Sequence, residues 1–142
     1  MGFGFSLMAR SDITLCASNS HFAFPELDIG IVPSIVMIDV HRFVNPKTAL
    51  EWLISGRQIS AEEVAQVGLV SKLIPPSSSF NEVVDTTIKE IAKKSPEAIS
   101  ITKSTFHKFG SLSPSEIEKL ASQVAADSLC NPIMLKSPKA IK

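Results

Sequence analysis

The stretch that decides the fold reads FAFPELDIGIVP and covers residues 22–33. Its first residues continue a short strand predicted over residues 21–24, which Pro25 ends because proline has no N–H to donate to a sheet. Pro33 and Ser34 then precede a predominantly apolar helix predicted over about residues 35–43. Glu26 stands among apolar side chains between the two prolines. This stretch therefore also holds the main candidate for acid/base chemistry.

Upstream of this stretch, the sequence predicts a short helix and a strand. Residues 1–9 are small and apolar, and the glycines among them allow close packing, or exposed backbone amides, just before a short helix begins. Residues 13–18 alternate between apolar and polar or small side chains, a period of two that indicates a β-strand. A turn is predicted at residues 19–20.

The downstream half is helical, and most of its helices are marked by a polar N-cap followed by proline. The cap–proline pairs are Asn45-Pro46, Ser95-Pro96 and Ser113-Pro114. Ser60 and Glu63 form a capping box that opens a further helix. An apolar stripe predicts a helix over residues 83–92, and a short apolar strand is predicted over residues 69–74.

The predicted strands are few and mostly early, whereas the helices are mostly late. A sheet of two or three strands cannot protect both its faces and its edges. The sequence therefore predicts a partial α/β domain, whose remaining strands come from upstream sequence or from another chain.

Composition argues against several classes of function. Fourteen basic residues balance fourteen acidic ones, so no charge excess favours nucleic acid or an anionic membrane surface. The longest apolar run, residues 29–38, is too short and too interrupted to span a bilayer. Cys16 and Cys130 have no partner motif, so neither a disulfide framework nor a metal site is expected. They favour a reducing compartment, which leaves the cytoplasm, the mitochondrial matrix and the peroxisome open.

Four motifs, in the same order, resemble those of the enoyl-CoA hydratase/isomerase (crotonase) family. Residues 2–13 resemble the second half of the family signature, and residues 22–33 resemble its Phe-x-x-Pro-Glu stretch. Residues 49–70 resemble the family block that runs from Ala-Leu-Glu through Gly-Arg-x-Ile-Ser-Ala-Glu-Glu to Gly-Leu-Val. Residues 95–98, followed by Lys103, resemble the Ser-Pro-x-Ala…Lys helix.

The resemblance implies a fold and an assembly. Family members have a core of stacked ββα turns and then a C-terminal helical region that builds trimers. We therefore expect the C-terminal part of a ββα-spiral core over residues 1–75 and a helical oligomerisation region over residues 76–142. The loop that holds the CoA adenine, and one amide of the oxyanion hole, are expected upstream. The implied partners are an acyl-CoA substrate and further copies of the chain, in a homo-trimer or a dimer of trimers. No separate cofactor is expected, because the substrate is a CoA thioester.

An oxyanion hole, made of two backbone N–H groups that hold the thioester oxygen, is the first site feature that the resemblance implies. The family's second amide donor matches Phe3, where the family has glycine, and the N–H of the next residue, Gly4, is assigned to the oxyanion hole as well. A glycine-rich stretch that opens a helix suits this role, because its amides are unpaired. Phenylalanine, however, adopts a positive φ only at a cost and would crowd the thioester. The alternative is a frayed, apolar chain start without a role.

Glu26 matches the family's second catalytic glutamate. Proton transfer at the carbon next to a thioester needs a carboxylate in an apolar pocket, and Phe22, Phe24, Leu27 and Ile29 are the expected walls. The alternative is a solvent-facing loop carboxylate, which is the common fate of a lone glutamate.

Ser6 departs from the family pattern, because it stands where hydratases have their first catalytic glutamate. Adding water uses two carboxylates, whereas isomerases move a double bond with one. Ser6, Pro33 and Ser34 are assigned to substrate binding, and the run after Pro33 is bulky and apolar, as in mitochondrial-type enoyl-CoA isomerases. The resemblance favours isomerisation of a 3-enoyl-CoA to a 2-trans-enoyl-CoA in fatty-acid metabolism. Hydration is the second enzymatic reading, and a catalytically inactive remnant that acts through oligomerisation is the alternative from another class.

Two further sets of charged residues are weaker candidates. Asp39 lies on the helix near the expected acyl pocket and is a weak candidate for a second acid/base group. Lys136 and Lys139 are in a position to reach CoA phosphates, although the tail departs from the family's terminal pattern and a solvated tail is the simpler interpretation.

Overall fold

The computed structural model describes residues 2–131, with side chains from Gly4 onward. It contains two compact units, the first ending at Val84 and the second beginning at Asp85. Each unit is described by itself. Lys136 and Lys139, the candidate phosphate contacts, lie outside the described residues.

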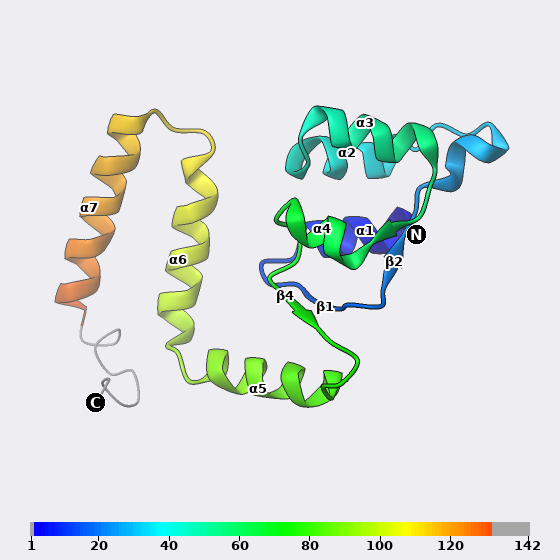
Figure 1. Cartoon of the computed structure of the whole chain (residues 1–142). Helices are drawn as coiled ribbons and strands as arrows, with labels where there is room; N and C mark the ends of the chain where they lie inside the picture. Colours follow the sequence, from blue (N-terminus) through cyan, green and yellow to red (C-terminus); the bar gives the residue numbers. More distant parts are fainter. Residues whose placement is uncertain (1, 132–142) are drawn as a thin grey trace. The chain divides into compact units, whose positions relative to one another are not determined.

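The first unit combines short helices with two small sheets (Figure 1). Its elements are α1 (Gly2–Ala9), β1 (Leu15–Ala17), β2 (His21–Phe22), η1 (Pro25–Ile29), α2 (Ser34–Phe43), α3 (Pro46–Ser55), β3 (Ile59–Ser60), α4 (Ala61–Gln66), β4 (Lys72–Ile74) and the start of α5 (Phe80–Ala92). Strand β1 pairs in parallel with β4, and β2 pairs antiparallel with β3. Figure 1 shows α2 and α3 on one side of α1 and α4, with β1 and β4 on the other side.

The predicted helix caps are confirmed, because they depend on neighbouring residues alone. The Asn45 side chain accepts a hydrogen bond from the Thr48 amide at 3.1 Å at the start of α3. Gly56 ends the same helix with a left-handed φ of 63°, which glycine adopts without strain. At α4, the Glu63 amide donates to Ser60 Oγ at 3.2 Å, and the Ser60 amide donates to Glu63 Oε2 at 2.9 Å. The strands differ more: β1, β2 and β4 are shorter than predicted, and β3 was not predicted.

Helix α1 begins earlier than the sequence suggests. The glycine-rich segment was expected ahead of a short helix, yet the helix already starts at Gly2. Two glycines in an eight-residue helix disfavour it intrinsically. Tertiary packing outweighs that cost, because the Phe5 ring is buried and meets the rings of Phe22 and Phe24 edge-on, at 6.2 and 5.0 Å between centroids.

The core of the first unit lies between α1, α2, α3 and α4. Its largest fully buried apolar side chains are Trp52, Phe5, Phe24, Ile59, Ile74, Val40 and Val64. Phe24 is fully buried directly before η1, so the core holds the entry to the turn that carries Glu26.

The second unit contains the rest of α5 with α6 (Pro96–Phe109) and α7 (Pro114–Cys130). Helices α6 and α7 pack alongside each other and run in opposite directions (Figure 1). Among the described residues, none in α5, α6 or α7 is buried. No helix within residues 2–131 has the length and apolar character to cross a membrane.

Candidate functional site

A cavity of about 280 Å³ lies where α1, η1 and the start of α2 meet. It is lined by Ser6 from α1, Glu26 from η1 and residues 31–36. The fold therefore brings together four residues that the sequence assigned to a site, namely Ser6, Glu26, Pro33 and Ser34. Their roles are not tested by this arrangement and stay predictions.

Glu26 is held by the backbone of a short 3₁₀ turn. Pro25 presets the first position of the turn, and Gly30 ends it with a left-handed φ of 74° and an N–H that donates to the Leu27 carbonyl. The Ile31 amide donates to the Glu26 carbonyl at 2.9 Å. The Glu26 side chain is half-buried, and its Oε2 atom is buried without a hydrogen-bond partner. Such an atom is available to accept a hydrogen bond from a ligand group or from water.

The cavity wall beside Glu26 is mostly apolar. Ile31, Val32, Ile35 and Val36 contribute aliphatic side chains, while Ser6 and Ser34 contribute hydroxyls. Ser6 is 6% exposed, and its Oγ also has no hydrogen-bond partner. Among the described residues that line the cavity, Glu26 is the single titratable one.

The two proposed amide donors lie in the first turn of α1. Backbone N–H groups in a first helical turn have no partner inside the helix, so those of Phe3 and Gly4 are of the right kind for an anion. Gly4 is exposed and is not among the residues that line the Glu26 cavity. The Phe3 side chain lies outside the described residues, so the expected crowding of the thioester stays a prediction.

Asp39 is a buried ion-pair partner. It is 1% exposed, and Arg10 Nε donates to its Oδ1 atom at 2.8 Å, across 29 residues of sequence. This hydrogen bond is the main cause that lowers the pKa of Asp39, against the opposing effect of burial. The nearby Ser6 hydroxyl lowers it further, although Ser6 Oγ and Asp39 Oδ2 do not meet the geometry of a formed hydrogen bond.

The burial of Asp39 had a signal in the sequence. Val36 and Val40, three residues before and one after Asp39, are both buried on α2. A carboxylate on the apolar face of an amphipathic helix needs a cation nearby. Its partner, Arg10, lies far upstream, so local patterns did not identify it.

The resemblance block over residues 49–70 contains a charged network on the surface of the first unit. Arg57 donates to both oxygens of Glu51, at 2.7 and 2.9 Å, and to Glu63 Oε1 at 2.7 Å. These bonds lower the pKa of both carboxyls. The network joins the end of α3 to α4. A structural role therefore explains these three charged residues.

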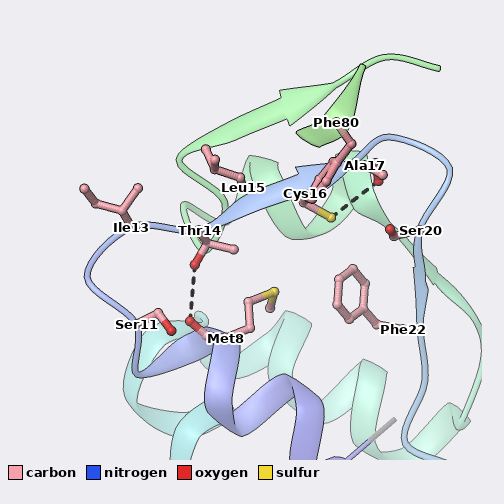
Figure 2. A pocket seen from close by; sticks show the side chains of 10 residues that line it. All are labelled: Met8, Ser11, Ile13, Thr14, Leu15, Cys16, Ala17, Ser20, Phe22 and Phe80. Carbon is pink, nitrogen blue, oxygen red and sulfur yellow. Dashed lines mark hydrogen bonds between the residues drawn. The ribbon is translucent and has the colours of Figure 1, made fainter. Parts of the chain in front are cut away.

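A larger cavity of about 490 Å³ lies between α1, β1 and β2 (Figure 2). The described residues that line it include neither a carboxylate nor a basic side chain. Its thiol, Cys16, is buried and donates to the Ala17 carbonyl, and Thr14 Oγ1 donates to the Met8 carbonyl (Figure 2). Because this cavity offers no carboxylate, the Glu26 cavity is the stronger candidate for acid/base chemistry. Residues 2–131 contain no cluster of three or more His, Cys, Asp or Glu side chains suited to a metal ion.

Comparison with known proteins identifies the family. A model of the enoyl-CoA hydratase/isomerase family matches residues 1–129. The rat enoyl-CoA hydratase domain-containing protein 3, mitochondrial, is 35% identical over 126 residues, which cover 89% of this chain and 42% of that protein. The carnitinyl-CoA dehydratase of Salmonella paratyphi A is 30% identical over 106 residues, which cover 74% of this chain and 40% of that protein.

Solved structures of the family have the same fold. The crystal structure of human enoyl coenzyme A hydratase domain-containing protein 3 matches with a TM-score of 0.86 at 30% identity, covering 98% of this chain and 57% of that one. An enoyl-CoA hydratase from Mycobacterium smegmatis matches with a TM-score of 0.84 over 95% of this chain and 52% of that one; at 22% identity this likeness concerns the fold alone. The expected partial crotonase-type fold is thus confirmed. The chain spans about two fifths of the length of the curated relatives it matches, and it belongs to the enoyl-CoA hydratase/isomerase family.

Proposed function

We propose that this chain supplies the acid/base part of an acyl-CoA site that moves a double bond from the 3- to the 2-trans position. One observation carries the proposal: Glu26 is the single carboxylate among the described residues of its cavity, and Oε2 is buried without a partner. Ser6 also lines the cavity, and by the family resemblance it stands in the place of the first catalytic glutamate of hydratases. One carboxylate suffices for isomerisation, because the proton that it removes is the proton that it returns.

In the proposed reaction, the Glu26 carboxylate takes a proton from C2 of a 3-enoyl thioester. The C2–H electron pair moves into a dienolate, and the negative charge on the thioester oxygen is held by backbone N–H groups. We assign one of them to Phe3 or Gly4 and expect the other from sequence outside these 142 residues. Glu26 then gives the same proton to C4, which leaves a 2-trans double bond. The aliphatic wall over residues 31–36 keeps water away from the dienolate.

The proposed assembly rests on the second unit. Helices α5, α6 and α7 have no buried residue among those described, and large apolar side chains such as Phe106 and Leu129 are 69% and 73% exposed. Such faces favour association with further copies of the chain. We propose a homo-trimer or a dimer of trimers. The same faces would support a catalytically inactive protein that acts through oligomerisation, and the assay below separates the two.

The test is an assay of the full natural protein that carries these residues. Short and medium 3-enoyl-CoAs are followed by the appearance of the conjugated 2-enoyl thioester. We expect Glu26→Gln to lower turnover by about 100-fold or more. Glu62→Gln is the matched control, because Glu62 is an exposed carboxylate of the same unit and the same substitution there is expected to leave turnover unchanged.

Three results would contradict the proposal. Turnover that survives Glu26→Gln removes this residue from the mechanism. Faster hydration of 2-trans-enoyl-CoA than isomerisation of the 3-enoyl thioester favours the hydratase reading. A folded, oligomeric protein without either activity favours the inactive one.

A further inference from the structure

Three buried side-chain oxygens have no hydrogen-bond partner among the described residues, and they lie on three neighbouring elements. They are Ser6 Oγ on α1, Glu26 Oε2 on η1 and Asp39 Oδ2 on α2. An unpaired buried oxygen is costly, so each such atom calls for an explanation. Ser6 and Glu26 line the same cavity, whereas Asp39 lies outside its lining.

Ser6 and Arg10 face the same element. Ser6 lies on α1, and Arg10 directly follows the helix, four residues later, with its amide donating to the Ser6 carbonyl at 3.2 Å; both therefore lie on one face, and α1 packs against α2. Arg10 binds Oδ1 of Asp39 at 2.8 Å. Asp39 Oδ2 has no partner in this structure, and the other polar group of that face is the Ser6 hydroxyl, which lowers the pKa of Asp39 although the two are not hydrogen-bonded.

The ionised state of Asp39 decides which way the Ser6 hydroxyl turns. Arg10, with the lowered pKa of Asp39, keeps this carboxyl ionised at neutral pH. An ionised carboxylate only accepts hydrogen bonds, and a serine hydroxyl has a single proton to donate. If that proton is given to Asp39 Oδ2, the lone pairs of Ser6 Oγ remain for the cavity.

We propose that Asp39, anchored by Arg10, is a positioning residue that turns Ser6 so that Ser6 Oγ faces the Glu26 cavity as a hydrogen-bond acceptor. The cavity then presents two acceptors, Ser6 Oγ and the Glu26 carboxylate, within an aliphatic wall. The cavity therefore prefers a ligand whose group at this place donates a hydrogen bond over a ligand whose group at the same place only accepts one. The inference rests on the proposed function in so far as the ligand is an acyl-CoA.

The experiment compares two acyl-CoA probes that differ at C3. The hydroxyl of 3-hydroxybutyryl-CoA donates, whereas the ether oxygen of 3-methoxybutyryl-CoA only accepts. Calorimetry gives the ratio of their dissociation constants for the wild type, Asp39→Asn, Ser6→Ala and the double variant. The extra methyl group of the methoxy probe is the same in the measurements on all four proteins. The readout is therefore the change in the ratio from one protein to the next. We expect Asp39→Asn to lower the preference for the hydroxyl about tenfold, the effect of about one hydrogen bond. We expect no such change when Ser6 is already alanine.

A second measurement needs neither a ligand nor a substitution at Asp39. The carboxyl of Asp39 is titrated by NMR in the wild type and in Ser6→Ala, which removes only the hydroxyl. A higher pKa of Asp39 in Ser6→Ala supports the contact, and an unchanged value overturns it.

The outcomes separate this inference from the proposed function. A ratio that Asp39→Asn leaves unchanged, with turnover still dependent on Glu26, overturns the positioning role alone. A ratio that responds through Ser6, with turnover independent of Glu26, overturns the proposed reaction alone. If the wild type binds neither probe, both ideas fail, because no thioester then reaches Ser6.

Discussion

The contact between Phe5 and Phe24 links the packing of the core to the positions of Ser6 and Glu26. Substituting Phe24 by a smaller residue tests this link. Phe24 is fully buried one residue before the Pro25 turn, and Phe5 directly precedes Ser6. The two rings are 5.0 Å apart at an interplanar angle of 83°. This edge-to-face contact therefore sets the distance between the elements that carry Ser6 and Glu26.

The size of the effect follows from burial. Phe24→Ala removes a fully buried ring and is expected to lower the free energy of unfolding by about 3–5 kcal/mol. That is a large part of the roughly 5–15 kcal/mol that holds a domain folded. Phe24→Leu keeps most of the apolar volume but loses the aromatic pair, so we expect a loss of about 2 kcal/mol. In a double-mutant cycle with Phe5→Leu, the two substitutions should couple by about 1 kcal/mol.

Trp52 provides the assay. It is the single tryptophan of the chain, it is 1% exposed, and it lies in the same unit as both rings. Urea denaturation followed by its fluorescence therefore reports the unfolding of this unit alone. Phe106→Leu is the control, because Phe106 is 69% exposed in the second unit and should change this transition by less than about 0.5 kcal/mol. Additive effects of Phe5→Leu and Phe24→Leu, or a loss below about 1 kcal/mol for Phe24→Ala, would refute the reasoning.

Two further predictions concern the cap of α4 and the ion pair of α2. Ser60→Ala removes the acceptor of the Glu63 amide and should lower the free energy of unfolding by about 1 kcal/mol in the same fluorescence assay. Ser60→Thr keeps a hydroxyl and should retain most of this stability. Equal losses in the two variants would show that the hydroxyl is not the cause. Arg10→Gln should destabilise the first unit at neutral pH. Because the folded-state pKa of Asp39 is lowered from 3.8, the contribution of the pair is complete above that value and is lost as the pH falls through the lower folded-state value. Denaturation of both proteins should therefore converge in acid once Asp39 is protonated, and a difference that persists after its protonation would mean that the pair does not cause it.

Local features of the fold were predictable from the sequence, because their causes lie within a few residues. The caps at Asn45 and Ser60 and the left-handed Gly56 each need only a side chain, a neighbouring amide or a turn angle. The start of α1 was not predictable in this way. Gly2 to Phe5 has low helix propensity, and the burial of Phe5 against rings some twenty residues later decides its structure.

The site itself was predicted only in part, and the reason is distance along the chain. Ser6 and Glu26 were named from the family resemblance, not from local pattern, because side chains on separate elements meet only in the folded structure. The sequence predicts Asp39 near the pocket, as a candidate acid/base. The fold instead gives it a cationic partner, Arg10, which no local pattern indicates.

The position of Glu26 depends on contacts from two sides of its turn. On one side, Phe24 is fixed by Phe5 of α1. On the other, a side chain at Gly56 would place its Cβ 3.5 Å from both the Phe24 carbonyl and Asp28 Oδ2, so the end of α3 lies close against η1. A 3₁₀ turn of five residues has few internal hydrogen bonds, and its geometry therefore depends on these neighbours. The cap of α3 is remote from the cavity in sequence, yet it belongs to the structure that holds the proposed proton shuttle in place.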